Sequence, residues 1–175
     1  MSLLEVKNLS LSIHGTPILH NVSLNVAPGE VVAVTGESGS GKSMTALTIM
    51  QLLPDGSETT GAVNFDGEDV TQSNEARMCA LRGNNIGMVF QEPMTALNPV
   101  QTIGAQIGET VLLHRPDLDA AARTAEVLER VGLSGISPRR YPHELSGGQR
   151  QRVVIAIAIA CGPKLLIADE PSPNP

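Results

Sequence analysis

The sequence predicts an α/β fold in which a mostly parallel sheet is joined to an N-terminal antiparallel β subdomain and a helical insertion. Apolar and polar residues alternate with period two near the N-terminus, as in half-buried antiparallel strands. Three continuous apolar runs are typical of buried parallel strands: 31–34, 86–90 and 165–168. From about residue 92 to residue 144 the pattern changes to helices and turns, which indicates an insertion within one domain.

The first strands are predicted from three alternating runs, at residues 4–6, 9–13 and 22–26. A turn is expected at residues 15–17, between the second and third runs. Pro28 and Gly29 predict a further turn before the apolar run 31–34. This part of the chain should therefore form the antiparallel subdomain and lead into the parallel sheet.

Residues 36–43 match G-x-x-x-x-G-K-[S/T], a loop that binds phosphate. Its glycines let the backbone approach a polyphosphate, so that successive N–H groups converge on the phosphate oxygens. Lys42 can reach the β- and γ-phosphates, and the Ser43 hydroxyl can bind Mg²⁺. We therefore predict a P-loop NTPase that binds a nucleotide polyphosphate and Mg²⁺. The residues predicted to contact the nucleotide here are Gly36, Glu37, Ser38, Gly39, Ser40, Gly41, Lys42, Ser43 and Met44.

A helix is predicted directly after this loop, at residues 44–53, and its N-terminus would add partial positive charge under the phosphates. The apolar residues expected to face inward are Met44, Leu47, Met50 and Leu53. A hairpin with its turn at residues 66–67 and a polar helix at 73–81 should follow. The strand 86–90 then ends at Gln91.

Two helices are predicted within the insertion. Ile103, Ile107 and Val111 are spaced for one helix face. Asp119 is a suitable N-cap for the next helix, which carries apolar residues before Gly132 ends it.

The pentapeptide L-S-G-G-Q at residues 145–149 predicts a second helix N-terminus that can bind an anion. The alternative is an ordinary N-cap with a flexible entry. The apolar strand 165–168 then places Asp169 and Glu170 at its carboxyl end, where ligands lie in an open α/β sheet. Asp169 can join the Mg²⁺ shell, and Glu170 can orient or deprotonate an attacking water. Without the upstream loop, they would be two acidic residues at a strand end.

Composition limits the partners. The formal net charge of −6 and the pI near 5.1 argue against a nucleic-acid partner, which would need a clustered basic surface. Cys79 and Cys161 are too few for a metal centre or a disulfide framework. The longest apolar run, 153–161, is too short to cross a bilayer, so any membrane-spanning part would come from other chains.

The order of these motifs resembles that in the nucleotide-binding subunit of ABC transporters: a glycine loop, Gln91, L-S-G-G-Q and a strand ending in Asp-Glu. The resemblance implies that two such domains hold two ATP molecules between them. It also implies an ATP hydrolase in which Gln91, Lys42 and Glu170 are catalytic, and in which Gln91 also contacts Mg²⁺. The residues implied to meet the γ-phosphate bound by the other copy belong to the set Ser146, Gly147, Gly148 and Gln149.

Residues 90–99, 102–104 and 141–145 resemble, more narrowly, the ATPases of bacterial dipeptide, oligopeptide and nickel importers. This likeness implies transmembrane permease subunits as partners and, indirectly, a periplasmic substrate-binding protein. It also implies a peripheral position at the cytoplasmic face of the inner membrane.

Two positions depart from the family pattern. Ile13 stands where an aromatic residue usually stacks on adenine, so it would contact adenine by apolar packing. Ser172 still fits the family's next motif, but from Pro173 onward the sequence does not, so a single domain, 1–175, is expected to be incomplete at its C-terminus. Two alternatives stay open: a remnant that binds ATP without productive turnover, and a soluble ABC ATPase that does not serve transport.

Overall fold

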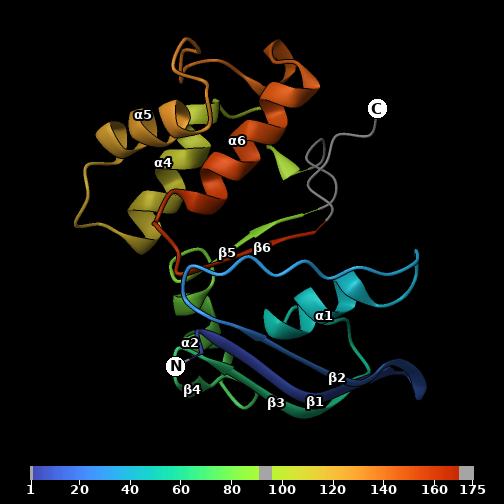
Figure 1. Cartoon of the computed structure of the whole chain (residues 1–175). Helices are drawn as coiled ribbons and strands as arrows, with labels where there is room; N and C mark the ends of the chain where they lie inside the picture. The colour runs from blue at the N-terminus through green and yellow to red at the C-terminus, as the bar shows by residue number, and fades with distance from the viewer. Residues whose placement is uncertain (1, 91–95, 170–175) are drawn as a thin grey trace. The chain divides into compact units, whose positions relative to one another are not determined.

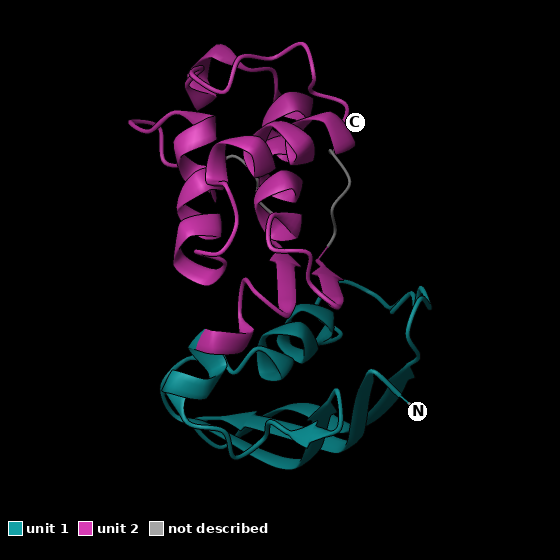
Figure 2. Cartoon of the chain, turned by 90° about the vertical axis from the view of Figure 1, so that its left-hand side faces the viewer, with its two compact units in different colours: residues 1–79 teal, residues 80–175 magenta. Residues whose placement is uncertain are grey.

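The structure is a computed structural model that describes residues 2–90 and 96–169 (Figure 1). The chain divides into two compact units, Met1–Cys79 and Ala80–Pro175, which Figure 2 colours separately. The first unit holds the glycine loop, and the second holds the L-S-G-G-Q motif and the strand before Asp169. Each unit is described by itself.

The first unit is built on a four-stranded antiparallel sheet in the order β2-β1-β3-β4. Its strands are β1 (Leu4–Ile13), β2 (Thr16–Val26), β3 (Ser57–Phe65) and β4 (Glu68–Asp69). The predicted antiparallel subdomain is therefore confirmed. The runs 4–6 and 9–13 belong to one strand, because Asn8 takes a left-handed conformation (φ 49°) and the register shifts there without breaking the strand.

Two short turns connect the strands of this sheet. His14 and Gly15 (φ 49° and 78°) join β1 to β2, and Asp66 and Gly67 (φ 52° and 85°) join β3 to β4. Both pairs have positive φ, which matches the twist of a two-residue hairpin. The turn at 66–67 was predicted correctly, whereas the first turn lies one residue earlier than the predicted 15–17.

The prediction of a buried parallel strand at residues 31–34 is wrong. These residues form no regular element, and Val31 is 95% exposed. A parallel strand needs a neighbour to pair with its N–H and C=O groups, and no strand among the described residues pairs with this run. Strand propensity depends strongly on such packing context, so an apolar β-branched run is insufficient by itself.

Helix α1 (Lys42–Ile49) follows the glycine loop, which confirms the order of loop and helix. It begins two residues before the predicted 44–53 and ends earlier, where Gln51 takes a left-handed conformation (φ 50°). The predicted inward face is correct for Met50, whereas Met44, Leu47 and Leu53 are only half-buried. The face that is buried instead carries Thr45, Ala46, Thr48 and Ile49. Helix α2 (Glu75–Leu81) confirms the polar helix predicted at 73–81.

The second unit contains a parallel strand pair, β5 (Ile86–Val89) and β6 (Leu165–Ala168), in register from Ile86 opposite Leu165 to Val89 opposite Ala168. Both strands were predicted. Its helices are α4 (Ile103–His114), α5 (Ala120–Arg130) and α6 (Gly147–Ile159), with a 3₁₀ turn at Pro142–Glu144. A Cβ on Gly87 of β5 would collide with the Ala158 carbonyl oxygen, so α6 lies directly against β5.

The core of this unit is aliphatic. Ile103, Ile107 and Val111 of α4 are each 0% exposed, as their spacing predicts. Helix α5 buries Thr124, Val127 and Leu128. Apart from Thr124, these side chains pack in one cluster with residues of β5, α6 and the connecting loops: Val89, Leu97, Leu133, Leu145, Val153, Val154, Ala156, Ala158 and Ala160.

Helix α5 has well-formed ends. The Asp119 carboxylate accepts hydrogen bonds from the Ala121 and Ala122 N–H groups at 2.9 and 3.2 Å, as predicted for the N-cap. At the other end Gly132 (φ 74°) and Leu133 donate to the carbonyls of Glu129 and Leu128. This is the Schellman arrangement, and it explains why Gly132 ends the helix.

Within residues 2–90 and 96–169, no helix combines the length and the hydropathy needed to cross a membrane.

Candidate functional site

The glycine loop runs from Gly36 to the first turn of α1. Residues 36–40 are exposed and irregular, and Ser40 N–H donates to the Glu37 carbonyl at 3.2 Å. Gly39 and Gly41 have φ of 82° and 89°, a conformation that other residues seldom adopt. The bent, exposed backbone that the motif predicts is therefore present.

Two of its glycines lie against neighbouring side chains. A Cβ on Gly36 would lie 2.6 Å from the Ser40 hydroxyl oxygen. A Cβ on Gly41 would collide with Leu19 Cδ2 of β2. Without side chains at these two positions, the loop backbone can face a ligand. Its N–H groups are the kind of donors that bind phosphate.

Lys42 closes the loop on itself. Its ammonium donates hydrogen bonds to the carbonyl oxygens of Gly36 and Glu37, both at 2.9 Å. These contacts hold the only cation of the motif beside the backbone that would surround a polyphosphate. A flexible lysine can exchange carbonyl acceptors for phosphate oxygens without moving its backbone.

The N-terminus of α1 is open to an anion. Its N-cap is Gly41, which has no side chain to cap the helix, and no acidic residue lies in the first turn. The first N–H groups of an α-helix, here including those of Lys42 and Met44, have no intrahelical acceptor. Such a terminus carries partial positive charge and favours phosphate.

Ile13, the predicted adenine contact, lies at the end of β1 and is half-buried. It pairs with Thr16 across the hairpin and with Ser57 of β3.

The second glycine motif forms the start of α6, as predicted. Ser146 is the N-cap: its hydroxyl accepts the Gln149 N–H at 3.3 Å, and the Gln149 side-chain oxygen accepts the Ser146 N–H at 3.0 Å. This reciprocal capping box fixes the first turn. The N–H groups of Gly147 and Gly148 lie in that turn and have no intrahelical acceptor.

Gly147 and Gly148 are not required by the fold of their unit. Both are exposed, neither has positive φ, and a Cβ on either would meet no atom within 4 Å. Gly36 and Gly41 differ from these two, because a Cβ on either would collide with a neighbouring side chain. The fold of the second unit therefore leaves room for a side chain at residues 147 and 148.

Asp169 follows β6 directly, and its N–H donates to the Val89 carbonyl at 2.9 Å, which continues the parallel ladder by one residue. The predicted position at the carboxyl end of a parallel strand is confirmed. Gln91 and Glu170, the other predicted catalytic residues, lie outside the described residues. Among the described residues, no group of three or more His, Cys, Asp or Glu side chains could hold a metal ion by itself.

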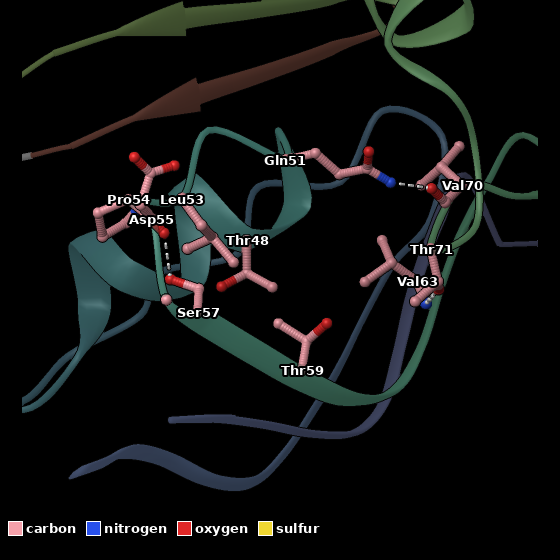
Figure 3. A pocket seen from close by; sticks show the side chains of 11 residues that line it. Thr48, Gln51, Leu53, Pro54, Asp55, Ser57, Thr59, Val63, Val70 and Thr71 are labelled. Atoms are coloured by element: carbon pink, nitrogen blue, oxygen red, sulfur yellow. Dashed lines mark hydrogen bonds between the residues drawn. The ribbon is translucent and has the colours of Figure 1, made fainter. Parts of the chain in front are cut away.

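A cavity of about 400 Å³ lies in the first unit, beside the end of α1 and the inner face of β3. Figure 3 shows Thr48, Ser57 and Thr59 around it. The Thr48 and Ser57 hydroxyls already donate to the Met44 and Pro54 carbonyls, at 2.6 and 2.7 Å. None of the predicted site residues lines this cavity.

Sequence reasoning did not predict the arginine contacts between the helices of the second unit. Arg123 of α5 reaches the end of α6, and Arg152 of α6 reaches the end of α5. Arginines on helical surfaces are common, and no sequence signal distinguishes these two from their neighbours.

Comparison with known proteins adds a family to this geometry. The family model described as "ABC transporter" matches residues 19–173. The chain is 52% identical to the peptidoglycan transport ATP-binding protein YejF of Agrobacterium fabrum, with 97% of this chain and 33% of the relative aligned. It is 46% identical to the oligopeptide transport ATP-binding protein AppD of Bacillus subtilis, over 98% of this chain and 55% of the relative.

Solved structures agree with the sequence relatives. The dimeric post-hydrolysis state of the ATP-binding cassette MJ0796, bound to ADP and Pi, superimposes with a TM-score of 0.83 at 31% identity. That alignment covers 97% of this chain and 74% of the cassette. The chain spans a third to about half the length of the two curated relatives. Since the family model matches most of the sequence and the fold agrees, the chain belongs to the ABC transporter family.

Proposed function

We propose that the chain is the ATP-binding and ATP-hydrolysing region of a transport subunit, and that two copies hold ATP between them. One observation carries this proposal: the fold leaves open space at Gly147 and Gly148, at an exposed helix N-terminus. Alanine is a better helix former than glycine, by about 1 kcal/mol in a helix interior. Two glycines at such a place are expected when a phosphate must come close to the backbone.

The ligand that fits is the γ-phosphate of a nucleotide bound to the glycine loop of a second copy. Within one copy, residues 36–44 would surround the phosphates and Ile13 would pack against adenine. Lys42 would exchange the Gly36 and Glu37 carbonyls for β- and γ-phosphate oxygens. In the other copy, the residues facing the γ-phosphate would be Ser146, Gly147, Gly148 and Gln149.

Hydrolysis needs a metal ion and a positioned water. Ser43, Gln91 and Asp169 are oxygen donors of the kind that Mg²⁺ prefers, and we assign them to its coordination. The ion supplies neutralisation of the charge that develops on the phosphoryl oxygens. Glu170, with Gln91, would orient the attacking water and accept its proton.

The transported substrate and the partners follow from the relatives. YejF and AppD are named for transport of peptidoglycan and of oligopeptides, so a peptide cargo is the favoured one, with nickel as the second choice. A permease would be the membrane partner, and a periplasmic binding protein would supply the cargo indirectly. This assigns the chain to the cytoplasmic face of the inner membrane. We expect no nucleic-acid partner.

Alanine substitution of Gly148 tests the proposal with a matched control. Gly108 of α4 lies inside a helix, and a Cβ there would make only ordinary contacts, at 3.8 Å from Thr124 Oγ1. Both Gly148→Ala and Gly108→Ala should raise thermal stability, because alanine favours helix. Only Gly148→Ala should prevent ATP-dependent dimerisation, measured by sedimentation with and without MgATP. Equal dimerisation of the two variants contradicts the proposal.

Phosphate release tests hydrolysis separately. The chain should release phosphate from ATP faster than Glu170→Gln does, whereas both should bind ATP. If the two forms bind ATP and release phosphate at the same background rate, this chain binds nucleotide without productive turnover.

A further inference from the structure

Helices α5 and α6, labelled in Figure 1, exchange arginine contacts. Arg123 lies in the first half of α5. Its guanidinium donates to the Ala160 carbonyl at 2.6 Å and to the Ile159 carbonyl at 3.3 Å, at the end of α6. The same group forms an ion pair with Glu126 at 2.6 Å, and its side chain is only 15% exposed.

Arg152 makes the reverse contact. It lies in the first half of α6, and its guanidinium is 3.4 Å from the carbonyl oxygens of Val131 and Gly132, at the end of α5. A Cβ on Gly132 would lie 2.9 Å from this guanidinium. Gly132 therefore both ends α5 and leaves room for Arg152.

Each arginine donates to carbonyl groups at or just beyond a helix end, where intrahelical donors are lacking. Helix α6 has no basic residue in its own last turn, so Arg123 is the cation at that end. The Arg123 contact also lowers the pKa of Glu126 below its ordinary value, chiefly through the side-chain hydrogen bond. The guanidinium is thus held from three directions.

The two contacts tie the end of α6 to α5 and the end of α5 to α6. The helices also share the apolar cluster that contains Val127 and Val153. Directional hydrogen bonds at both ends of the pair oppose a shift of one helix along the other. The first turn of α6 carries residues 146–149, so its place in the unit depends on the same bonds.

We propose that Arg123 and Arg152 are positioning residues, which hold the first turn of α6 in the place where it can meet the γ-phosphate bound by a second copy. This inference rests on the proposed function of that turn. A purely structural role would instead make the two arginines contribute to folding stability alone, with no effect on the position of the turn in the folded protein.

The test replaces each arginine by methionine, which keeps most of the apolar stem and removes the donors. Arg130→Met is the matched control, because Arg130 is exposed in the last turn of the same helix as Arg123. The first measurement is the set of amide NMR resonances of residues 146–149 in the full chain. Arg123→Met and Arg152→Met should each shift these resonances, and Arg130→Met should leave them in place.

The second measurement is ATP-dependent dimerisation at a temperature where every variant is folded. Arg123→Met should weaken it about tenfold, since hydrogen bonds to a charged group are lost in each copy. The affinity of the single chain for ATP should stay unchanged, because the glycine loop is untouched. Arg123→Lys, which retains one charged donor, should recover part of the loss.

The outcomes distinguish the positioning role of the two arginines from the proposed function of the chain. If the melting temperature falls while the resonances of 146–149 and the dimer affinity stay unchanged, the arginines are structural only and the inference is overturned. If Arg123→Met does not fold, Arg152→Met decides, because Arg152 is exposed and its bonds are longer. If the unmodified chain does not dimerise with MgATP, the proposed function is contradicted. The positioning role is then tested only by the amide resonances of residues 146–149.

Discussion

At the scale of single residues, Lys42 shows how the positive charge of the glycine loop is held in place. Its ammonium is satisfied by the carbonyls of Gly36 and Glu37, so the charge is held at the loop. The spacing of the motif predicted which residue would carry the charge. The spacing could not predict these acceptors, because they depend on how the backbone folds between Gly36 and Lys42.

Replacing Lys42 by methionine should lower ATP affinity about 10- to 100-fold, since charge-assisted hydrogen bonds to the phosphates are lost. Lys7→Met is the control: Lys7 is exposed and lies 2.9 Å from Glu5 on the antiparallel sheet. Titration calorimetry with MgATP measures both variants. Similar affinities for the two would show that Lys42 does not contact the nucleotide.

A carboxylate at the surface of the first unit gives a pH-dependent prediction. The hydrogen bonds from Arg77 lower the pKa of Glu68, and the distance from Arg77 Nε to Glu68 Oε1 is 2.9 Å. A carboxyl whose folded-state pKa is lowered adds stability above its unfolded-state pKa, and this contribution is lost as the pH falls through the folded-state pKa.

Glu68→Gln should therefore reduce the stability difference between neutral pH and acid, as measured by thermal unfolding at a series of pH values. The effect should be small, because both side chains are exposed. Glu58→Gln, at another exposed position of the same sheet, is the control. An unchanged pH profile for Glu68→Gln would show that the pair adds nothing in solution.

At the scale of elements, helix ends were predictable because their signals are local. Asp119 caps α5 and Ser146 caps α6, as their residue types and positions indicate. Residues 31–34 show the opposite case, since a parallel strand depends on partners distant in sequence. The apolar run there is exposed and unpaired in the described part of the chain, although its composition is typical of a strand.

The N-cap of α5 offers an element-scale test. Asp119→Ala should destabilise the chain by about 1 kcal/mol, because two N–H groups lose their acceptor. Asp117→Ala removes only an exposed ion pair with Arg115 and should have a smaller effect. Urea unfolding compares the two variants. Equal losses of stability would argue against capping as the role of Asp119.

At the scale of the whole molecule, the sequence predicted the α/β class, the antiparallel subdomain and the helical insertion, because each leaves its own periodicity. The roles of Gln91 and Glu170 stay predictions, since these residues lie outside the described part. The contacts between α5 and α6 were not predictable, because they pair residues 20 or more positions apart. Local patterns thus identified the motifs, whereas packing decided how they are held.

If the ATP site is shared between two copies of the chain, mixing two variants with complementary defects should restore it. Lys42→Met removes the phosphate contact of one loop, and Ser146→Arg blocks the first turn of α6. Each variant alone should remain monomeric with MgATP in sedimentation, with Glu170→Gln present throughout to prevent turnover. Mixed together, they restore one intact site. The unaltered loop of the Ser146→Arg copy meets the unaltered first turn of α6 in the Lys42→Met copy.

MgATP should raise the sedimentation mass of this mixture from the 18.4 kDa of one chain toward that of a dimer. A mixture that remains monomeric while the chain carrying only Glu170→Gln dimerises would contradict a shared site.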